Sequence, residues 1–487
     1  MTPFQTLARP NNIGPSLMPS RGKLGLISLV ALLLNGCMST PPQNEHQRKI
    51  QENAPFALTD HEGNSQQTLA QQPKAPSNWI KSFNDADLDQ WVAIAITDNF
   101  DLAQARARVD AAQQLRSSSA SNLWPTLDLE VTQQRQKTTG STTDYQNNAG
   151  ISASVAWEAD LWGKLSNTRD ASDFRWQAEQ ARFNASKLSL SAQIAKAWFD
   201  VIAASQLSQL LTERVDNLTT NLDIIQNGYR QGINNALDVY LAQSDLANES
   251  NSLQQQLAQE KAEIRQFQLL LGQYPSGKLE GNPQKNRSLP LLSILNADQL
   301  TAQNVRHRPD LQATYLELLA SNQDLAVAHK NRFPSFRLTG NSGDSSDELK
   351  NLLDTSSLAW SILGGLSQPL FSGGKLKALE QQQRALVEQK EQQYLNTLYT
   401  AFNEVEQNIT NESALKLQLE LVSDSKTYSE AAEALAFEEY RQGLQSYTSV
   451  LEAQRRAFGA QNSVISIRNQ LLQNRINLYL ALGGNTQ

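Results

Sequence analysis

Apolar residues between Asn235 and Leu271 recur at the spacing of a coiled coil. This stretch contains neither Gly nor Pro, and six of its apolar residues are spaced 7, 4, 7, 3 and 4 apart: Leu246, Leu253, Leu257, Ile264, Phe267 and Leu271. That spacing is a heptad seam. Two longer runs, 164–227 and 375–442, also lack Gly and Pro and are rich in Ala, Leu, Gln and Glu, which favours helix. Helices of that length would extend roughly 95–100 Å.

The hydrophobic period changes to two between Pro125 and Gly163. Apolar residues alternate with polar ones at Leu127, Leu129 and Val131, and again at Ile151, Ala153, Val155 and Trp157, around a polar loop at 136–148. A weaker copy follows at Phe336, Leu338, Trp360, Ile362 and Leu366, around the polar loop 343–357. The pattern predicts two β-hairpins, each with one apolar and one polar face. Alternation alone favours a soluble half-buried sheet, but the long helices and the lipobox described below reverse that preference toward a membrane barrel.

The second half of the chain repeats the first. The stretch beginning Tyr440-Arg441-Gln442-Gly443 follows Tyr229-Arg230-Gln231-Gly232 by 211 residues. Pro334 follows Pro125, and Asp310-Leu311 follows Asp101-Leu102, by 209 residues. Landmarks in the same order at nearly one offset indicate two copies of one unit, each with a hairpin of a long and a shorter helix.

The N-terminal residues predict export and lipidation. Arg21 and Lys23 precede the apolar run 24–34, which is too short to span a bilayer and is typical of a secretory signal. The following Leu34-Asn35-Gly36-Cys37 resembles a bacterial lipobox, so Cys37, the only cysteine, is expected to carry palmitate. The alternative is an ordinary signal peptide that ends near a cysteine. Whether Met1 or Met18 is the start stays open, and Met38 after the cysteine favours outer-membrane sorting.

Charge and composition exclude several classes of function. The formal charge of −7 becomes −10 once residues 1–36 are removed, because three basic residues and no acidic residue are lost. This acidity argues against a nucleic-acid partner. No later segment approaches 18 uncharged apolar residues, so no transmembrane helix is predicted.

The sequence offers no catalytic or cofactor motif. The four histidines show no metal-ligand spacing, and a second cysteine for a zinc site is missing. Gly373-Gly374-Lys375-Leu376 lacks the earlier Gly and the Ser or Thr of a phosphate-binding loop. We therefore expect a non-enzymatic protein without a metal or cofactor.

The number of strands in each chain predicts self-association. Each chain supplies four strands, and four strands cannot close in lipid without leaving unpaired backbone groups. Two copies would supply eight strands and three copies 12, and the residues alone do not choose between them.

At this point the chain resembles the outer-membrane factors, the TolC-like efflux channels, and within them the NodT-type multidrug efflux lipoproteins. The resemblance covers nearly the whole mature chain and is carried by Trp157-Glu158-Ala159-Asp160-Leu161-Trp162-Gly163-Lys164, both Tyr-Arg-Gln-Gly tips, Arg308-Pro309-Asp310 and 368–375. It implies a mostly α-helical homotrimer with a transmembrane β-barrel. Four strands per chain would complete a 12-stranded barrel, continued by long periplasmic coiled-coil helices.

The resemblance and the patterns together set the expected boundaries. The signal peptide covers 1–36, a lipid-anchored extension 37–80, repeat 1 81–272, an equatorial segment 273–305 and repeat 2 306–487. Within repeat 1 we expect a helix at about 85–122, a hairpin at 126–159 and helices at 164–228 and 235–271. Within repeat 2 we expect a helix at about 310–332, a hairpin at 335–370 and helices at 375–441 and 446–482.

The resemblance also implies where partners bind. The tips 229–235 and 440–446 would contact a periplasmic adaptor that links the channel to an inner-membrane pump of the RND or a similar type. The expected adaptor-contacting residues are Tyr229, Arg230, Gly232, Tyr440, Arg441 and Gly443. Ser449 and Glu452 stand where the family narrows its tunnel with acidic rings, and Tyr440 is placed for a hydrogen bond at the tip.

The resulting prediction is an exit channel in the Gram-negative outer membrane, anchored by lipid, that passively conducts drugs or toxic small molecules. The alternatives are the outer-membrane channel of a type I protein secretion system and a periplasmic coiled-coil adaptor or scaffold. The alternating hairpins weigh against the scaffold, and the lipobox with the Trp157–Lys164 motif favours efflux over secretion.

Overall fold

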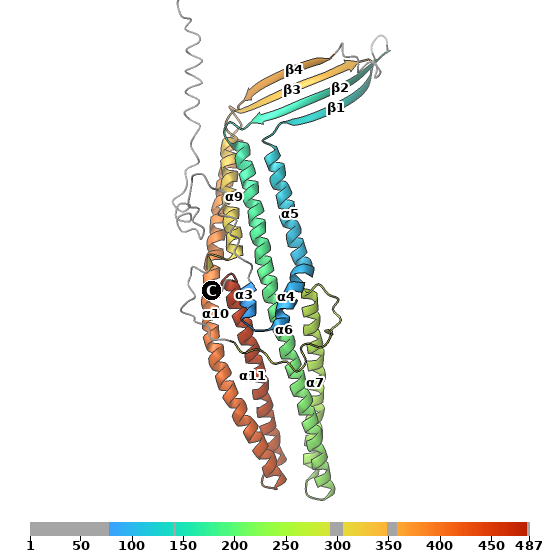
Figure 1. The fold of residues 1–487 in the computed structure, drawn as a ribbon, viewed down its shortest axis with the longest axis vertical. Coiled ribbons are helices and arrows are strands. Elements are labelled where there is room, and N and C mark those ends of the chain that lie inside the picture. Colours follow the sequence, from blue (N-terminus) through green and yellow to red (C-terminus); the bar gives the residue numbers. More distant parts are fainter. Residues whose placement is uncertain (1–76, 140–142, 293–304, 348–357, 485–487) are drawn as a thin grey trace, which may run out of the picture. The chain divides into compact units, whose positions relative to one another are not determined.

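The computed structural model of the protein describes residues 77–139, 143–292, 305–347 and 358–484, all within one compact unit, 46–487. Cys37 and most of the expected lipid-anchored extension, 37–80, lie outside the described residues. Figure 1 shows the elements, which are α3 (Ser77–Lys81), α4 (Ala86–Asp98), α5 (Phe100–Ser121), β1 (Thr126–Thr139), β2 (Thr143–Ala159), α6 (Lys164–Arg230), α7 (Ala236–Leu270), α9 (Pro309–Lys330), β3 (Ser335–Ser346), β4 (Ala359–Ser367), α10 (Lys375–Arg441) and α11 (Tyr447–Ala481).

The two halves have helices of matching length. α5 and α9 each have 22 residues, α6 and α10 each have 67, and α7 and α11 each have 35. At 1.5 Å per residue, α6 and α10 each extend about 100 Å. No helix in the described ranges contains a stretch that is both long and apolar enough to cross a membrane.

The single helix expected over about 85–122 is wrong, because Asn99 divides it into α4 and α5. Asn99 has an extended backbone, with ψ at 128°, and its side-chain oxygen accepts a hydrogen bond from the Leu102 N–H at 3.0 Å. This is the geometry of a helix N-cap. The Asn99 amide also donates to the Leu270 carbonyl at 3.0 Å, so the break ties α5 to the end of α7.

The hairpins also differ from expectation at their ends. Backbone pairing runs through most of the predicted polar loop 136–148, so β1 has 14 and β2 has 17 residues, and it continues into the second predicted loop as far as Ser346. Ladder hydrogen bonds involve only the backbone and do not require apolar side chains. β4 ends at Ser367 rather than at 370, and Pro369, which has no N–H to donate to a ladder, follows two residues later.

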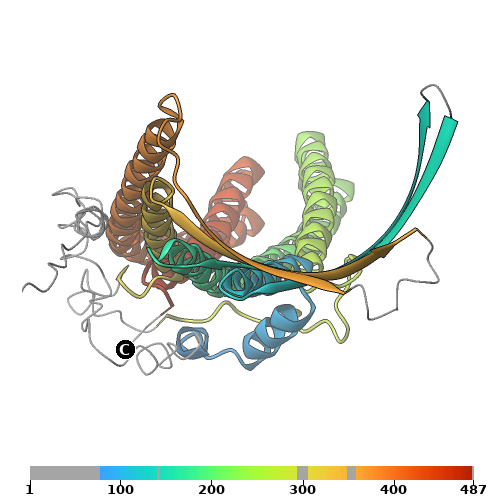
Figure 2. The same cartoon turned by 90° about the horizontal axis from the view of Figure 1, so that it is seen from above.

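The four strands form one antiparallel sheet in the order β1-β2-β3-β4 (Figures 1 and 2). Directly paired residues share a face, and the register Leu129↔Ala153↔Ser342↔Trp360 places the predicted apolar positions of all four strands together. This apolar face is open: Leu127, Leu129, Trp360 and Ile362 are between 69% and 74% exposed. In one chain, β1 and β4 are the edges of the sheet.

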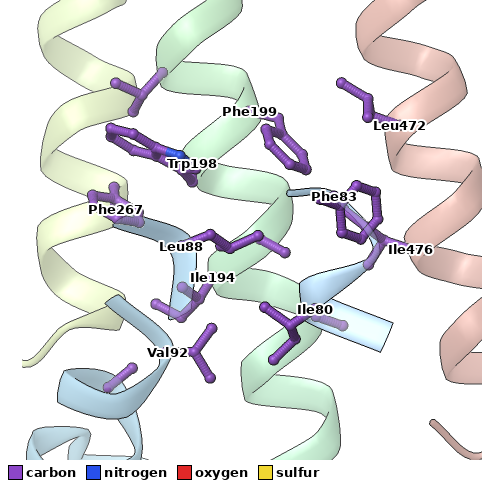
Figure 3. Packing of buried hydrophobic residues seen from close by; sticks show 14 of the residues in the cluster. Ile80, Phe83, Leu88, Val92, Ile194, Trp198, Phe199, Phe267, Leu472 and Ile476 are labelled. Carbon is purple, nitrogen blue, oxygen red and sulfur yellow. The ribbon is translucent and has the colours of Figure 1, made fainter. Parts of the chain in front are cut away.

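The largest core cluster lies where α3, α4, α6, α7 and α11 meet (Figure 3). Trp198 of α6 and Phe267 of α7 are fully buried there, with Leu88 of α4 and Ile476 of α11. The indole N–H of Trp198 donates to the Asp85 carboxylate at 3.0 Å. This cluster fixes the two helical hairpins of the chain to each other at mid-length.

Candidate functional site: the two hairpin tips

Both helical hairpins turn at a glycine in the left-handed conformation. Gly232 has φ +77° and Gly443 has φ +75°. After each glycine, the next N–H donates back to the helix: Ile233 to the Gly228 carbonyl at 2.8 Å, and Leu444 to the Glu439 carbonyl at 2.9 Å. These bonds form the C-terminal cap that glycine at this position allows.

The first tip presents apolar side chains to solvent. Tyr229 is 50% exposed, Ile233 75%, Leu237 62% and Tyr240 70%. The Arg230 guanidinium donates to the Asn227 side-chain oxygen at 3.1 Å, which keeps it on the helix surface. Four large apolar groups gathered at one exposed turn are typical of a surface that meets another protein.

The second tip covers its tyrosine, Tyr440, in part. The Tyr440 ring packs against the Tyr447 ring with centroids 5.4 Å apart, and Tyr447 is only 1% exposed. The hydrogen bond expected for Tyr440 is not formed within the described chain, because this packing encloses both hydroxyls without a polar partner. Burial, and after it the nearby Asp238 carboxylate, raises the pKa of Tyr440.

The residues expected to form the gate lie just beyond this cluster on α11. The Ser449 hydroxyl donates to the Gln445 side-chain oxygen at 3.2 Å, so Gln445 serves as an acceptor there. Glu452 accepts from Arg456 at 2.8 Å in an exposed pair one helical turn apart. Ser449, Glu452 and Arg456 line one open groove between α10 and α11. The Glu452 carboxylate therefore faces this groove, with the Arg456 guanidinium beside it.

A buried arginine that the sequence analysis missed joins the two hairpins above the tips. Arg214 of α6 pairs with Glu249 of α7 at 3.0 Å, donates to the Gln454 carbonyl of α11 at 3.1 Å and lies over the Phe458 ring. Burial raises the pKa of nearby Glu433, although Arg214 acts against the shift. The residues around Arg214 are mostly polar, so the sequence gives no signal of these contacts.

A second polar network joins α6 to α11 higher up. Lys196 bonds the Asn477 side-chain oxygen, and Asp200 accepts from Asn469 at 2.6 Å and from Gln473 at 2.9 Å. Burial raises the pKa of Asp200 and lowers the pKa of Lys196. Beside the core cluster, and below it at Arg214, the contacts between the two hairpins thus include polar, directional bonds.

The Trp157–Lys164 motif lies where the sheet meets α6, and its side chains make the junction. The Asp160 carboxylate accepts from the N–H groups of Leu165 and Ser166, both at 2.8 Å. Partial burial acts to raise the pKa of Asp160, but these hydrogen bonds hold it below its usual value. The Trp162 indole donates to the Pro334 carbonyl of the other repeat. The motif fixes the sheet on the helices and has no catalytic arrangement.

In the part of the chain that the structure describes, no three His, Cys, Asp or Glu side chains lie close enough together to hold a metal ion. Cys37, the expected lipidation site, lies outside that part.

Comparison with known proteins gives one consistent result. The sequence profile described as "Outer membrane efflux protein" matches residues 91–273 and 300–484, which are the two repeats. The toluene efflux pump outer membrane protein TtgF of Pseudomonas putida is 28% identical over 418 residues, covering 84% of this chain and 86% of that protein. The outer membrane protein OprJ of Pseudomonas aeruginosa is 24% identical over 462 residues, covering 94% of each.

Solved structures share the fold. The outer-membrane channel OprN superposes with a TM-score of 0.78 at 23% identity, covering 92% of this chain and 98% of OprN. The CmeC outer membrane channel of Campylobacter jejuni superposes with a TM-score of 0.77 at 23% identity, covering 88% and 94%. With both repeats matched and the sheet, helices and tips arranged as described, the chain belongs to the outer membrane efflux protein family.

Proposed function

We propose that the protein is the outer-membrane exit channel of a tripartite efflux system, built from three copies of this chain. It would passively conduct small toxic molecules that an inner-membrane pump and a periplasmic adaptor deliver to it. The observation that carries the proposal is the single sheet with an exposed apolar face, joined directly to two 67-residue helices. An apolar face of this kind suits lipid, and the helices are long enough to cross the periplasm in part.

Self-association is supported by an exposed seam on α10. Its apolar side chains are spaced 4, 7 and 7 residues apart and are between 58% and 74% exposed: Leu417, Leu421, Tyr428 and Leu435. A heptad stripe open to water is a coiled-coil seam that lacks its partner. Three copies, with four strands each, give a barrel of 12 strands.

The adaptor would dock at the tips, chiefly at the first. Its exposed Tyr229, Ile233, Leu237 and Tyr240 supply the apolar anchors that protein interfaces favour. Arg230 and Arg441 would add rim charges. The gate at Ser449 and Glu452 lies on the second hairpin, so the main docking surface and the gate would lie on different halves of the chain.

Cargo is proposed from the relatives, several of which are named as toluene, solvent or antibiotic efflux proteins. We infer that this channel passes small apolar compounds of the same kind. Lipidation at Cys37 would anchor each copy in the outer membrane. Mass spectrometry of the mature protein should find acyl chains on Cys37, and an unmodified Cys37 would contradict the anchor.

The test of function is the accumulation of cargo in cells that lack this gene. Deletion should raise the intracellular level of toluene and of antibiotics, and the wild-type gene should restore export. A matched variant, Gly232→Val with Gly443→Val, should fail to restore export although it still forms trimers. Unchanged accumulation together with loss of a secreted protein would assign the channel to type I secretion instead.

A further inference from the structure

A pocket lies at mid-length of the helices, at the point where the end of α11 meets the start of α9. Its volume is about 680 Å³, and residues of α6 and α10 line its sides. This volume is within the roughly 300–1,000 Å³ range of small-molecule sites in proteins. The lining includes no tip residue and neither Ser449 nor Glu452, so neither the adaptor nor the gate gives this mid-length pocket a role.

The mid-length pocket opens on the face of the helices that points away from the core cluster. On α6, Trp198 packs into that cluster with Leu88 of α4 (Figure 3), whereas Ser189 lines the pocket. Ser189 and Trp198 are nine residues apart, which is two and a half turns, so their side chains leave opposite sides of α6. On α11, Gln470 of the pocket lies 18 residues, or five turns, from Glu452 and so shares its face. In the proposed channel the pocket therefore faces the tunnel, as the gate residue does.

The charged groups of the mid-length pocket are bonded to one another. The Arg308 guanidinium donates to the Asp310 carboxylate at 2.8 Å, to the Glu404 carboxylate at 2.5 Å and to the Ala481 carbonyl at 3.2 Å. Among the residues that line the pocket, these three side chains are the charged ones. An anion finds no free cation here, and both carboxylates already have a partner. The network therefore favours a neutral molecule over an ion.

Most of the remaining polar lining consists of neutral carboxamides. Two of them, Gln407 and Asn411 of α10, are four residues apart and so lie on one face of the helix. Neither side chain has a hydrogen-bond partner in the part of the chain that the structure describes. A carboxamide both donates and accepts hydrogen bonds, so these two groups suit a ligand that does the same.

The equivalent positions of repeat 1 are already engaged. At the offset of 211 residues they are Lys196 and Asp200 of α6, and both side chains bond to carboxamides of α11. A neutral ligand that displaced these bonds would leave a partly buried charge without its partner, which is unfavourable. The open carboxamides of α10 carry no such cost, so the site is specific to the second repeat.

Apolar side chains from three helices complete the mid-length pocket. They are Leu188 of α6, Leu415 of α10 and Leu480 of α11, and Leu188 is only 4% exposed. A lining of apolar side chains with a few placed polar groups is the usual composition of a small-molecule site. The leucines would take the apolar part of a ligand and the two carboxamides its polar part.

We propose that the mid-length pocket binds neutral molecules that combine an apolar group with an amide or hydroxyl group, and holds such cargo briefly on the tunnel wall. The inference rests on the proposed function, because the pocket faces a tunnel only in the assembled channel. Binding must be weak, since a molecule held tightly would not leave. Chloramphenicol has the required chemistry: it is uncharged and carries an aromatic ring, an amide and hydroxyl groups. Toluene has the apolar part alone.

Ligand-observed NMR on the full-length protein in detergent, with detergent alone as the blank, tests the role of the carboxamides. Gln407→Leu with Asn411→Leu removes their hydrogen bonds and should weaken chloramphenicol binding at least about tenfold, equivalent to about 1.4 kcal/mol. Toluene binding should not fall in this variant. The matched control is Gln389→Leu with Gln393→Leu, which has the same spacing on the same face of α10, five turns away and outside the pocket. The control should bind chloramphenicol as the wild type does.

Protection of a cysteine gives a second readout that locates the site. Chloramphenicol should slow maleimide labelling of Asn411→Cys at least about twofold, because the bound molecule would cover that position. Gln393→Cys, on the same face of α10 but outside the pocket, should be labelled at an unchanged rate. The wild-type chain reports any background from Cys37. Equal protection of both cysteines would overturn the assignment to this pocket.

The outcomes separate the pocket from the proposed function. Equal chloramphenicol binding by the Gln407 and Asn411 variant and its control would overturn the mid-length pocket, because the molecule would then bind elsewhere. Absence of saturable binding to a trimer whose gene still restores toluene export would overturn the pocket alone. A chain that forms no trimer, or whose gene does not restore toluene export, would overturn the proposed function as well.

Discussion

The two helical hairpins have the same lengths and the same turn, yet their seams differ at equivalent positions. Val201 of α6 and Ile264 of α7 are buried apolar residues of one core cluster. Their equivalents, Glu412 of α10 and Arg475 of α11, form an ion pair and are 4% and 1% exposed. Helix length and turn therefore set the architecture, whereas the seam residues determine how well each hairpin tolerates substitution. An apolar pair is non-directional, but a buried ion pair requires both partners.

The two tips also differ, although both contain the tetrapeptide Tyr-Arg-Gln-Gly. Tyr229 is half exposed, whereas Tyr440 is packed against Tyr447. Tyr447 occupies the position that Ala236 holds in the first hairpin, and alanine is too small to cover a tyrosine ring. One residue after the turn thus decides whether the tip faces a partner or its own chain.

Breaking the ion pair should have the largest effect. Arg475→Leu leaves the buried Glu412 carboxylate with only the part-exposed Lys416 and the neutral Asn474 amide as described partners, and we expect a loss of about 3–5 kcal/mol. Glu412→Val with Arg475→Ile copies the first hairpin and should be neutral or more stable by about 1–4 kcal/mol. The thermal midpoint of the detergent-solubilised protein measures both. A double variant as unstable as Arg475→Leu would contradict the equivalence of the two seams.

Valine at either turn glycine should have a smaller effect that is equal at the two tips. A Cβ at Gly232 or Gly443 meets no atom within 4 Å, so the cost of about 1–2 kcal/mol is backbone strain alone. Gly232→Val and Gly443→Val should lower the stability alike. Adaptor binding should fall further for Gly232→Val, because the exposed apolar side chains follow that turn. Equal adaptor binding by both variants would contradict the proposal that the adaptor docks chiefly at the first tip.

Alkaline pH should loosen only the second tip, and this effect is smaller still. Burial raises the pKa values of Tyr440 and Tyr447, so the folded state favours their neutral phenols. The stability from this pair is complete below pH 10, the unshifted value, and is lost as the pH rises toward the raised values. Hydrogen-exchange protection near 447–451 should fall there. Replacing both tyrosines by phenylalanine should abolish that fall, and an unchanged fall would assign it to other groups.

Glu452→Gln should change the stability least. Its exposed pair with Arg456 is worth less than about 1 kcal/mol. The equivalent residue of the first hairpin is Leu241, so the carboxylate is specific to the second. We expect lower cation selectivity in planar bilayers with a smaller change in conductance, and Arg456→Gln as the matched control should raise the selectivity. Unaltered cation selectivity in both variants would indicate that packing at Tyr440, and not Glu452, closes the end of the tunnel.

The repeats, the long helices, the hairpins and the turn glycines were predictable because each has a local periodicity or breaker. The division at Asn99 was not, because its cap is completed by the distant Leu270 carbonyl. Arg214 and the Glu412–Arg475 pair were missed for a similar reason. Their partners lie on other helices, and a charged residue in a polar-rich helix gives no sign of its burial. Among the candidate site residues, only the glycines had a role fixed by local geometry.

Native mass spectrometry of the detergent-solubilised protein tests the central claim most directly, since the exit channel requires that the open edges of one chain be closed by other copies. The account predicts a complex of three chains, with 12 strands, as the predominant species. A stable monomer or dimer as the only species would contradict it.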